Sequence, residues 1–410
     1  MEKENLNYTS FKNFGIDSKI IQILENNNIS KPTGIQSLSI PKILQKKDII
    51  GISGTGSGKT LAFCLPLLNS LLKKNRKYHS LILTPTRELA IQIKNVLNLI
   101  GEEFGLKVIL LVGGEDMKAQ KMAFNKLRKD IHVIVGTPGR LLDHMLNSNL
   151  KIEKLKFLVF DEADKLLSMD FESDIKHILE RINNDRQTLL FSATINENVQ
   201  NIISLGLKNP IILDSNDKNK ELIQKYVFVG LKYKHGYLYE IIKKNKEKKI
   251  IIFVSTSFST VLLFRMLNNL GLSNLAYIYG DMRQERRNNN LKKFREGDAN
   301  ILIATDVLSR GIDIPSVDIV INYDISKNFD DYIHRVGRTA RAGKKGLALT
   351  FVTQYDVEEF QRVEHKLNIK MDEYCLDEKV IKDNFIIVEE AYNIGYKEAK
   401  EKMLKKKKNK

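Results

Sequence analysis

Asp-Ile-Ile-Gly-Ile-Ser-Gly-Thr-Gly-Ser-Gly-Lys-Thr occupies residues 48–60 of this 410-residue chain, and the expected architecture follows from it. A β-branched run is followed by a loop in which every second residue is glycine, and then by a segment of helix-forming residues. Glycines let backbone N–H groups approach phosphate oxygens closely, and the N-terminus of a helix adds a favourable dipole. The segment therefore predicts a phosphate-binding loop between a buried strand and a helix. Its residues are Ser53, Gly54, Thr55, Gly56, Ser57, Gly58, Lys59 and Thr60.

Two side chains at the end of this loop carry the expected chemistry. We expect Lys59 to reach the β- and γ-phosphates of a nucleotide, and the Thr60 hydroxyl to bind Mg²⁺. Ser53 stands where the common pattern has glycine, and a small residue suffices there. The alternative is a glycine-rich turn with a chance Lys-Thr pair, which the flanking strand and helix disfavour.

An acidic segment further along the chain fits the same chemistry. The four apolar residues 157–160 run directly into Asp161 and Glu162. We expect Asp161 to hold Mg²⁺ through water, and Glu162 to orient and deprotonate the attacking water. Taken alone, the segment is more typical of an ordinary acidic strand end.

Short β-branched runs alternate with longer amphipathic segments, which predicts an α/β protein with parallel sheets covered by helices on both faces. The expected strands are 48–52, 81–83, 108–111, 133–135, 158–160, 188–191, 211–213, 226–229, 250–254, 276–279, 301–304, 319–322 and 347–351. A polar segment without periodicity separates the first seven from the rest. We expect a first domain at 1–213, a linker at 214–220, a second domain at 221–370 and a basic extension at 371–410. That end of the chain reads as a helix from about residue 356 and then a mixed polar stretch, whose final lysines are expected to stay solvated.

The composition excludes several classes of protein. Lys and Arg total 66 against 50 Asp and Glu, and the formal net charge of +16 suggests an anionic partner, although a merely soluble basic protein is the alternative. Cys64 and Cys375 cannot form a disulfide framework or a structural zinc site. The apolar runs are far shorter than the ~20 residues of a membrane helix, and the first ten residues contain no segment typical of a secretory signal. We therefore expect a cytoplasmic protein without membrane contact.

Residues 161–164 read Asp-Glu-Ala-Asp, and together with their neighbouring motifs they resemble the DEAD-box family of ATP-dependent RNA helicases. The resemblance extends from Phe11 to Phe360 and consists of motifs in the family's order and spacing. It implies two tandem RecA-like parallel-sheet domains flanking an ATP and RNA cleft. It also implies an RNA-dependent ATPase that uses ATP and Mg²⁺ and is a monomer in its catalytic unit.

The resemblance assigns the adenine base to Phe11 and to the segment 31–36, Lys-Pro-Thr-Gly-Ile-Gln. Phe11 is expected to stack on the base, Gln36 to make a bidentate contact with its edge, and Lys31 to belong to the same ATP-binding segment. Gly34 replaces the family's usual proline, which loosens the turn and removes no contacting side chain. Taken alone, the segment is more typical of a helix-entry loop.

Another motif is expected to couple the γ-phosphate to the rest of the protein. Ser192 and Thr194 resemble the family's coupling motif, whose hydroxyls are expected to link Asp164 to events at this phosphate. His334 in the second domain belongs to the same expected group. Many strands end in a Ser-x-Thr sequence, so only the position of this motif in the chain supports its assignment.

The second domain is expected to complete the ATP site. Its segment 304–313 resembles a motif that touches ribose and RNA, with Gly311 and Asp313 at the nucleotide. Arg338 and Arg341 match the family's arginine fingers, and on a helix this spacing would place both on one face, within reach of a single phosphate. The family usually has glycine where Ala340 stands. Without this context, the segment could be a basic surface helix.

Several motifs resemble the family's RNA contacts, and each pairs a hydroxyl, a basic group or an exposed N–H with a strand end or a helix start. Their residues are Pro85, Thr86, Arg87, Gly114, Thr137, Pro138, Gly139 and Arg140 in the first domain, and Gln284, Arg287 and Thr305 in the second. The motifs contain no aromatic residue on which a base could stack. We therefore expect contacts with the RNA backbone and 2′-hydroxyls and a weak sequence preference. In isolation, each motif is more typical of a solvated turn.

Together these motifs predict an RNA helicase that hydrolyses ATP on RNA binding and separates short duplexes or remodels RNA–protein complexes locally, without long translocation. One alternative is an ATP-gated RNA clamp with little turnover, which an assay of RNA-stimulated turnover separates from a helicase. The others are a DNA helicase on the same two-domain core, which a comparison of ribo- and deoxyribo-strands tests, and a structural NTPase that binds no nucleic acid.

Overall fold

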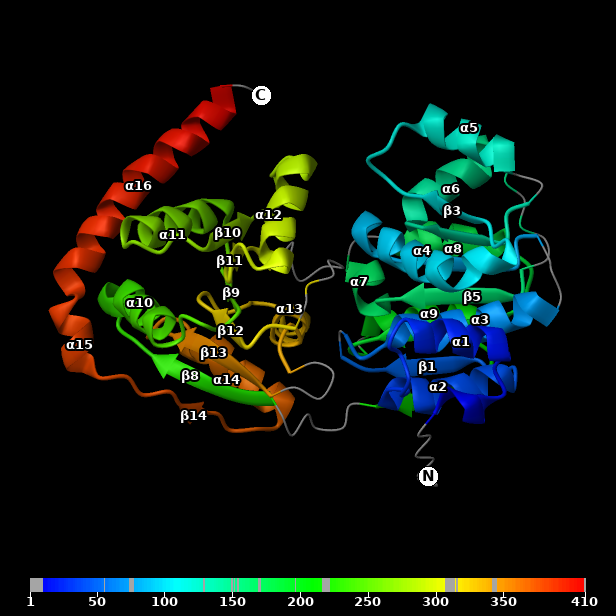
Figure 1. Cartoon of the computed structure of the whole chain (residues 1–410), viewed down its shortest axis with the longest axis horizontal. Coiled ribbons are helices and arrows are strands. Elements are labelled where there is room, and N and C mark those ends of the chain that lie inside the picture. Colours follow the sequence, from blue (N-terminus) through cyan, green and yellow to red (C-terminus); the bar gives the residue numbers. More distant parts are fainter. Residues whose placement is uncertain are drawn as a thin grey trace. The chain divides into compact units, whose positions relative to one another are not determined.

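The computed structural model describes residues 10–408 apart from 55, 74–76, 128–129, 149, 151, 153–154, 169–170, 196, 216–221, 307–313, 315 and 341–344. The chain divides into two compact units, Met1–Asp217 and Lys218–Lys410. Each unit is built around one seven-stranded sheet (Figure 1). From residue 216 onward, the predicted linker lies outside the described residues.

The sheet of the first unit has the order β3-β4-β2-β5-β6-β1-β7. Its strands are β1 Ile49–Ile52, β2 Ser80–Leu83, β3 Val108–Leu111, β4 Val133–Gly136, β5 Phe157–Asp161, β6 Gln187–Ser192 and β7 Ile211–Asp214. The helices of this unit are η1 Phe11–Phe14, α1 Ser18–Asn26, α2 Gly34–Leu44, α3 Lys59–Lys73, α4 Arg87–Gly101, η2 Glu102–Phe104, α5 Met117–Leu127, α6 Pro138–Asn147, α7 Ala163–Ser168, α8 Glu172–Glu180 and α9 Glu197–Gly206. All the pairs between these strands are parallel, as the sequence predicts.

The strand register brings the predicted phosphate chemistry to one edge of this sheet. Ile52, the last residue of β1, pairs with Ser192 at the end of β6. Asp161, the last residue of β5, pairs with Phe191 of β6. Because parallel strands end at a common edge, the loop after β1 and the carboxylates after β5 lie at the same carboxyl edge.

The sheet of the second unit has the order β10-β11-β9-β12-β13-β8-β14. Its strands are β8 Leu222–Phe228, β9 Ile250–Phe253, β10 Leu275–Ile278, β11 Ile301–Ala304, β12 Ile319–Asn322, β13 Gly346–Val352 and β14 Asp372–Glu373. Its helices are η3 Leu231–Tyr233, α10 Lys234–Lys244, α11 Ser257–Asn269, α12 Gln284–Glu296, α13 Phe329–Val336, α14 Val357–Leu367, α15 Glu378–Asp383 and α16 Phe385–Lys408. Each strand predicted in either unit is present, and the sequence analysis missed the two-residue β14.

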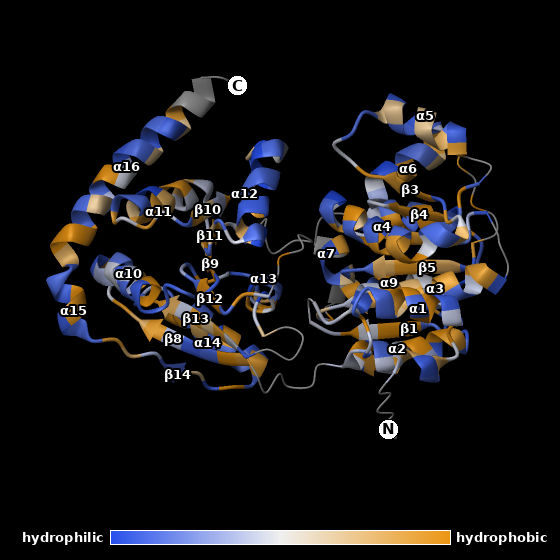
Figure 2. Cartoon of the chain, in the orientation of Figure 1, coloured by the Kyte–Doolittle hydropathy of each residue, from blue (hydrophilic) through white to orange (hydrophobic). Residues whose placement is uncertain are grey.

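Both sheets have a hydrophobic core on each of their two faces, and the strands run as apolar segments between amphipathic helices (Figure 2). The central strands β2, β4, β9, β11 and β12 are buried along their whole length. This is why their apolar runs are uninterrupted, since neither side of such a strand faces water. No helix of the described residues is sufficiently long and apolar to cross a membrane.

The end of the chain differs from the expected polar stretch, because residues 385–408 form the 24-residue helix α16. This helix packs along α11 (Figure 1). Its buried residues Val388, Ala391 and Ala399 recur at helical spacing. At Gly395 the two backbones come so close that an added Cβ would lie 2.9 Å from Met266 N. Tyr392 and Tyr396 add ring contacts with His235 and Phe258, at 4.3 and 5.4 Å between centroids. The contact residues of α16 are few and separated by charged residues, which explains why the composition of this segment is typical of a polar stretch.

Candidate functional site

The predicted phosphate loop follows β1 and leads into α3, and its geometry depends on glycine. Gly56 and Gly58 have φ of 77° and 93°, in the left-handed region that favours glycine. The Lys59 ammonium donates to the loop's own carbonyls, Ser53 O at 2.7 Å and Gly54 O at 3.3 Å. The Ser57 hydroxyl lies 2.7 Å from Gly54 O. The buried lysine thus holds the loop closed on itself, and phosphate oxygens would have to replace these carbonyls.

Gln36 fastens the same loop to helix α2. Its Nε2 donates to Gly58 O at 2.9 Å, and its Oε1 accepts from Thr33 N at 2.9 Å. A Cβ added at Gly58 would lie 2.4 Å from Gln36 Nε2. The buried amide of Gln36 is therefore bonded to the protein at both ends. The predicted contact with adenine stays a prediction, and it requires an exchange of these partners.

The other two residues predicted to belong to the adenine-binding segment differ in how exposed they are to solvent. Phe11 is only 2% exposed and its ring packs edge-on against Phe14 at 6.0 Å between centroids. Stacking of Phe11 on a base stays a prediction and requires the ring to become uncovered. Lys31 is exposed at the start of the turn that precedes α2.

Asp161 and Glu162 lie where β5 ends. Asp161 is 2% exposed, and its burial raises the pKa of this carboxyl to about 7, with Lys59 opposing the shift and the charge of Glu162 adding to it. Glu162 has φ of 51°, an uncommon backbone conformation for a residue with a side chain. Lys165 Nζ lies 3.0 Å from Glu162 Oε2, and the two residues are 5% and 6% exposed. The expected general base is thus held in a buried ion pair.

A buried carboxylate with a raised pKa fits the predicted Mg²⁺, because a neighbouring divalent cation favours the ionised form. Thr60, the second residue of α3, follows Lys59 directly. Nowhere in the described part of the chain, this site included, do three or more His, Cys, Asp or Glu side chains gather into a metal site. An ion here would therefore take most of its ligands from nucleotide phosphates and water, which is usual for Mg²⁺.

Ser192, at the strand end of β6, contacts Asp164, and the predicted link of this pair to the γ-phosphate stays a prediction. Ser192 Oγ lies 2.8 Å from Asp164 Oδ1 and 2.7 Å from Thr194 O, so its single proton is shared between two acceptors. The backbone N–H of Asp164 donates to the same hydroxyl at 3.3 Å. The coupling residues of the first unit therefore contact one another directly.

Two arginines predicted to bind RNA in the first unit, Arg87 and Arg140, meet at Glu115. Arg87 Nη2 lies 3.0 Å from Glu115 Oε1, and Arg87 Nη1 donates to Gly114 O at 3.4 Å. Both terminal nitrogens of Arg140 donate to Glu115 O at 3.1 Å. Thr86 caps α4 after Pro85, and Thr137 precedes Pro138 and Gly139 at the start of α6. The sequence analysis missed Glu115, which partly neutralises this basic surface.

In the second unit, Arg287 lies in the first turn of α12, and Thr305 directly follows β11. Arg287 Nη2 donates to Gly280 O at 2.9 Å. Thr305 is 8% exposed, and its hydroxyl is buried without a hydrogen-bond partner among the described residues. A buried hydroxyl without a partner is costly, and an RNA oxygen could satisfy it.

The arginine motif does not form one continuous helix, which corrects the expectation of a shared helical face. Helix α13 ends at Val336, Gly337 caps it, and Arg338 lies in the turn that follows. Ala340 has φ of 53°, a left-handed conformation that explains why glycine is usual at this position. Arg338 and His334 are 3% and 1% exposed. Contact of Arg338 with a phosphate therefore requires its side chain to become uncovered.

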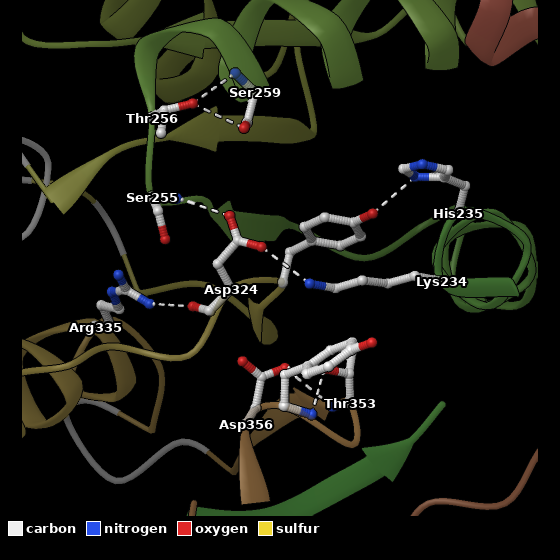
Figure 3. Close-up of polar contacts among 11 residues, drawn as sticks. Lys234, His235, Ser255, Thr256, Ser259, Asp324, Arg335, Thr353 and Asp356 are labelled. Atoms are coloured by element: carbon white, nitrogen blue, oxygen red, sulfur yellow. Dashed lines mark hydrogen bonds and ion pairs between the residues drawn. The ribbon is translucent and has the colours of Figure 1, made fainter. Parts of the chain in front are cut away.

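Arg335, which the sequence analysis did not single out, holds this region together. Its Nε and Nη2 donate to the two carboxylate oxygens of Asp306 at 2.5 and 2.8 Å. Its Nη1 donates to Asp324 O at 2.7 Å (Figure 3). The Asp324 carboxylate accepts from Lys234 Nζ and from Ser255 N, each at 2.9 Å. The guanidinium therefore ties the ends of β11 and β12 to α13.

Known proteins share these motifs and this fold. A family model described as DEAD/DEAH box helicase matches residues 33–202, and one described as helicase conserved C-terminal domain matches residues 233–343. The probable ATP-dependent RNA helicase DDX47 of Homo sapiens is 45% identical over 88% of this chain and 80% of that protein. The chain belongs to the DEAD-box family of ATP-dependent RNA helicases.

Two further comparisons agree with this family. The ATP-dependent rRNA helicase rrp3 of Aspergillus terreus is 43% identical to this DEAD-box helicase over 94% of the chain and 85% of the relative. The solved structure of S. cerevisiae Dbp5 bound to RNA and ADP BeF3 is 29% identical, with a TM-score of 0.79 over 94% of this chain and 100% of that chain. The RecA-like fold expected from the resemblance is confirmed.

Some predicted site residues of this DEAD-box helicase lie outside the described residues. They are Thr55, Gly311, Asp313, Arg341 and the side chain of Gln284. Their roles stay predictions.

Proposed function

We propose that this DEAD-box helicase hydrolyses ATP when RNA binds, and that it thereby separates short RNA duplexes or remodels RNA–protein complexes locally and non-processively. The observation that carries the proposal is the position of the phosphate loop, Asp161 and Glu162 at one edge of the first sheet, joined to the Asp164–Ser192 contact. A phosphate cradle, a buried carboxylate and a positioned base are the parts that phosphoryl transfer to water needs.

The residues of the loop would act first by exchanging partners. When ATP binds, Lys59 leaves the carbonyls of Ser53 and Gly54, and its ammonium contacts the β- and γ-phosphates. Bound Mg²⁺ would supply Lewis-acid stabilisation of the charge on these phosphates, next to Asp161 and Thr60. Glu162 orients a water molecule towards the γ-phosphate and accepts its proton, which requires its carboxylate to separate from Lys165.

The second unit is proposed to supply the cations that stabilise the transition state. Arg338 and Arg341 would contact the γ-phosphate only when RNA and ATP are both bound, so each ligand would favour binding of the other. The buried position of Arg338 agrees with a residue that is not available to ATP in the absence of RNA.

RNA is the proposed substrate, bound through its backbone and 2′-hydroxyls with little sequence preference. The basic residues Arg87, Arg140 and Arg287 support this, since phosphate contacts position a strand without reading bases. Because a relative 43% identical over 94% of this chain is named an rRNA helicase, we propose ribosomal RNA as the substrate class. A monomeric catalytic unit and a cytoplasmic location stay predictions, which light scattering and imaging of a tagged chain would test.

One observation favours the alternative of an ATP-gated RNA clamp. Glu162 is engaged by Lys165 in a buried ion pair, which lowers its availability as a base. Turnover measured with and without RNA decides between the two, with Glu162→Gln as the reference for lost catalysis. The helicase proposal requires RNA to stimulate ATP hydrolysis strongly in the parent and not in Glu162→Gln. A parent rate that stays at the Glu162→Gln level with saturating RNA would leave the clamp as the function.

A further inference from the structure

A cavity of about 530 Å³ lies on the first unit, at the edge of the sheet where the strands begin and opposite the edge that carries the phosphate loop. The segments that lead into β2, β5 and β6 line it, together with the last turns of α2 and α3. The phosphate loop follows the carboxyl end of β1, whereas this cavity lies at the amino ends of the parallel strands. Its volume falls within the range of roughly 300–1,000 Å³ that is common for small-molecule sites.

The cavity is lined by four cationic side chains, Lys46, Lys73, Lys156 and Arg186. Asp185 supplies the one carboxylate among its described lining residues. In the part of the chain that the structure describes, none of the four cations forms an ion pair. The positions of Lys46 and Lys73 at the ends of α2 and α3 are explained by the helix dipole, which favours cations there. Lys156 and Arg186 precede strands, so the dipole does not explain them.

Arg186 is the member of this set whose bonding is incomplete. Its Nη1 donates to Asn183 O at 2.5 Å, but its Nε is buried without a hydrogen-bond partner among the described residues. Burial also lowers the pKa of this guanidinium, with the charge of Asp48 opposing the shift. The Nε of this half-buried arginine is therefore withdrawn from water without gaining an acceptor, and an anion in the cavity would provide one.

The rest of the wall combines an apolar part with the polar residues Asn69, Ser70, His79 and Gln187. Phe157 packs against the His79 ring with 5.3 Å between centroids. The two ring nitrogens of His79 lie 3.1 Å from Ser70 Oγ and 2.8 Å from Ser80 Oγ, which fixes the orientation of the imidazole. Ile43, Leu44 and Pro66 complete the apolar surface. Such a wall suits a ligand that has an apolar or aromatic body as well as a charged group.

We propose that this cavity binds a small phosphorylated molecule with an apolar or aromatic body, separately from the ATP site. Arg186, Lys156 and Lys46 would hold the phosphate, since an arginine fork matches its oxygens and lysines add charge. The body of the ligand would lie against Phe157. The proposal does not depend on the helicase mechanism, because it uses none of the residues placed in the ATP or RNA site.

Phenyl phosphate is the probe that tests this site, and inorganic phosphate is the probe for the anion alone. Each is titrated into the full chain with ADP saturating the phosphate loop, and amide NMR shifts report where it binds. The expected result is a saturable shift of the amides of Lys156, Arg186 and Gln187, at lower concentrations of phenyl phosphate than of inorganic phosphate. The amides of Gly56 and Gly58 should not move.

Variants show whether the shift depends on the proposed cations. Arg186→Gln and Lys156→Gln should each weaken phenyl phosphate by about tenfold or more, because each loses a hydrogen bond to a charged group. Lys176→Gln, which removes an exposed lysine from α8, is the matched control and should bind as the parent does. Thermal unfolding checks that Arg186→Gln is folded, and Lys156→Gln carries the test if it is not. The absence of a saturable shift, or equal binding by the parent and Lys156→Gln, would overturn the proposal.

Discussion

Replacing Lys165 with methionine removes the cation beside Glu162 and is expected to destabilise the first unit strongly. The Lys165 Nζ and Glu162 Oε2 atoms are 3.0 Å apart, and the two residues are 5% and 6% exposed. An exposed ion pair contributes about 0–1 kcal/mol to stability. Breaking a buried pair by removing one partner instead costs about 3–5 kcal/mol, because the other charge stays buried.

The residues around Lys165 and Glu162 show that this ion pair is a buried one. Asp161 next to it is also buried, and burial followed by the charge of Glu162 raises its pKa to about 7 despite Lys59. Loss of Lys165 would leave these carboxylates with less positive charge nearby. We therefore expect the free energy of unfolding of the first unit to fall by about 3–5 kcal/mol in Lys165→Met.

Hydrogen exchange of peptides covering β5, followed through a urea series, measures this loss. Peptides covering β12 report the second unit and should be unchanged. Glu162→Gln should also destabilise the first unit, because it leaves the Lys165 ammonium buried without its counter-ion. The double variant, which removes both charges, should recover most of the loss of Lys165→Met. A loss of no more than about 1 kcal/mol, or a double variant as unstable as Lys165→Met, would refute this reasoning.

Three further predictions test other parts of the structure. Gly58→Ala should weaken ATP binding by about tenfold or more in a fluorescent-nucleotide titration. An alanine with a left-handed backbone costs about 1–2 kcal/mol, and its Cβ would displace Gln36. Unchanged affinity would contradict the geometry of the loop. Burial, and after it the charge of a neighbouring lysine, lowers the pKa of His235 to about 4. This neutral imidazole contributes about 3 kcal/mol to the free energy of unfolding of the second unit above pH 6.5, and this contribution should be lost as the pH falls to 4. Denaturant unfolding at both pH values should show a smaller loss for His235→Phe than for the parent. Gly395→Val should detach α16, because the new Cβ would lie 2.9 Å from Met266 N, and limited proteolysis should then cut α16 faster than in the parent.

The sequence predicts the two sheets because their central strands are buried on both faces. Runs such as Ile250–Phe253 contain no polar residue, and segments with turn-forming residues separate them. The helix α16 is harder to recognise, since its buried Val388, Ala391 and Ala399 are spread among many charged residues. Its position depends on the close approach at Gly395, which only the folded chain shows.

The candidate site also contains residues that the sequence predicts and residues that only the folded structure shows. The phosphate loop and the acidic strand end depend on local residue order, so the sequence predicts them. Lys165, Glu115 and Arg335 could not be singled out, because the first two neutralise charges of the site and the third ties two strand ends through contacts set by the tertiary fold. The expectation of one helical face for the arginines was wrong, because the backbone at Ala340 is left-handed and the helix ends at Val336.

The most direct test of the proposed function is single-turnover ATP hydrolysis by Arg341→Ala at saturating RNA, measured beside its ATP affinity without RNA. If this arginine completes the site only when RNA is bound, the affinity should stay near that of the parent, because Lys59 and the loop amides remain. The hydrolysis rate should fall by about 10³–10⁵, the value of an arginine finger in related reactions. Arg341→Lys should not restore the rate, because an ammonium lacks the planar fork. Normal hydrolysis by Arg341→Ala, or loss of its ATP binding in the absence of RNA, would contradict an ATP site completed by the second unit.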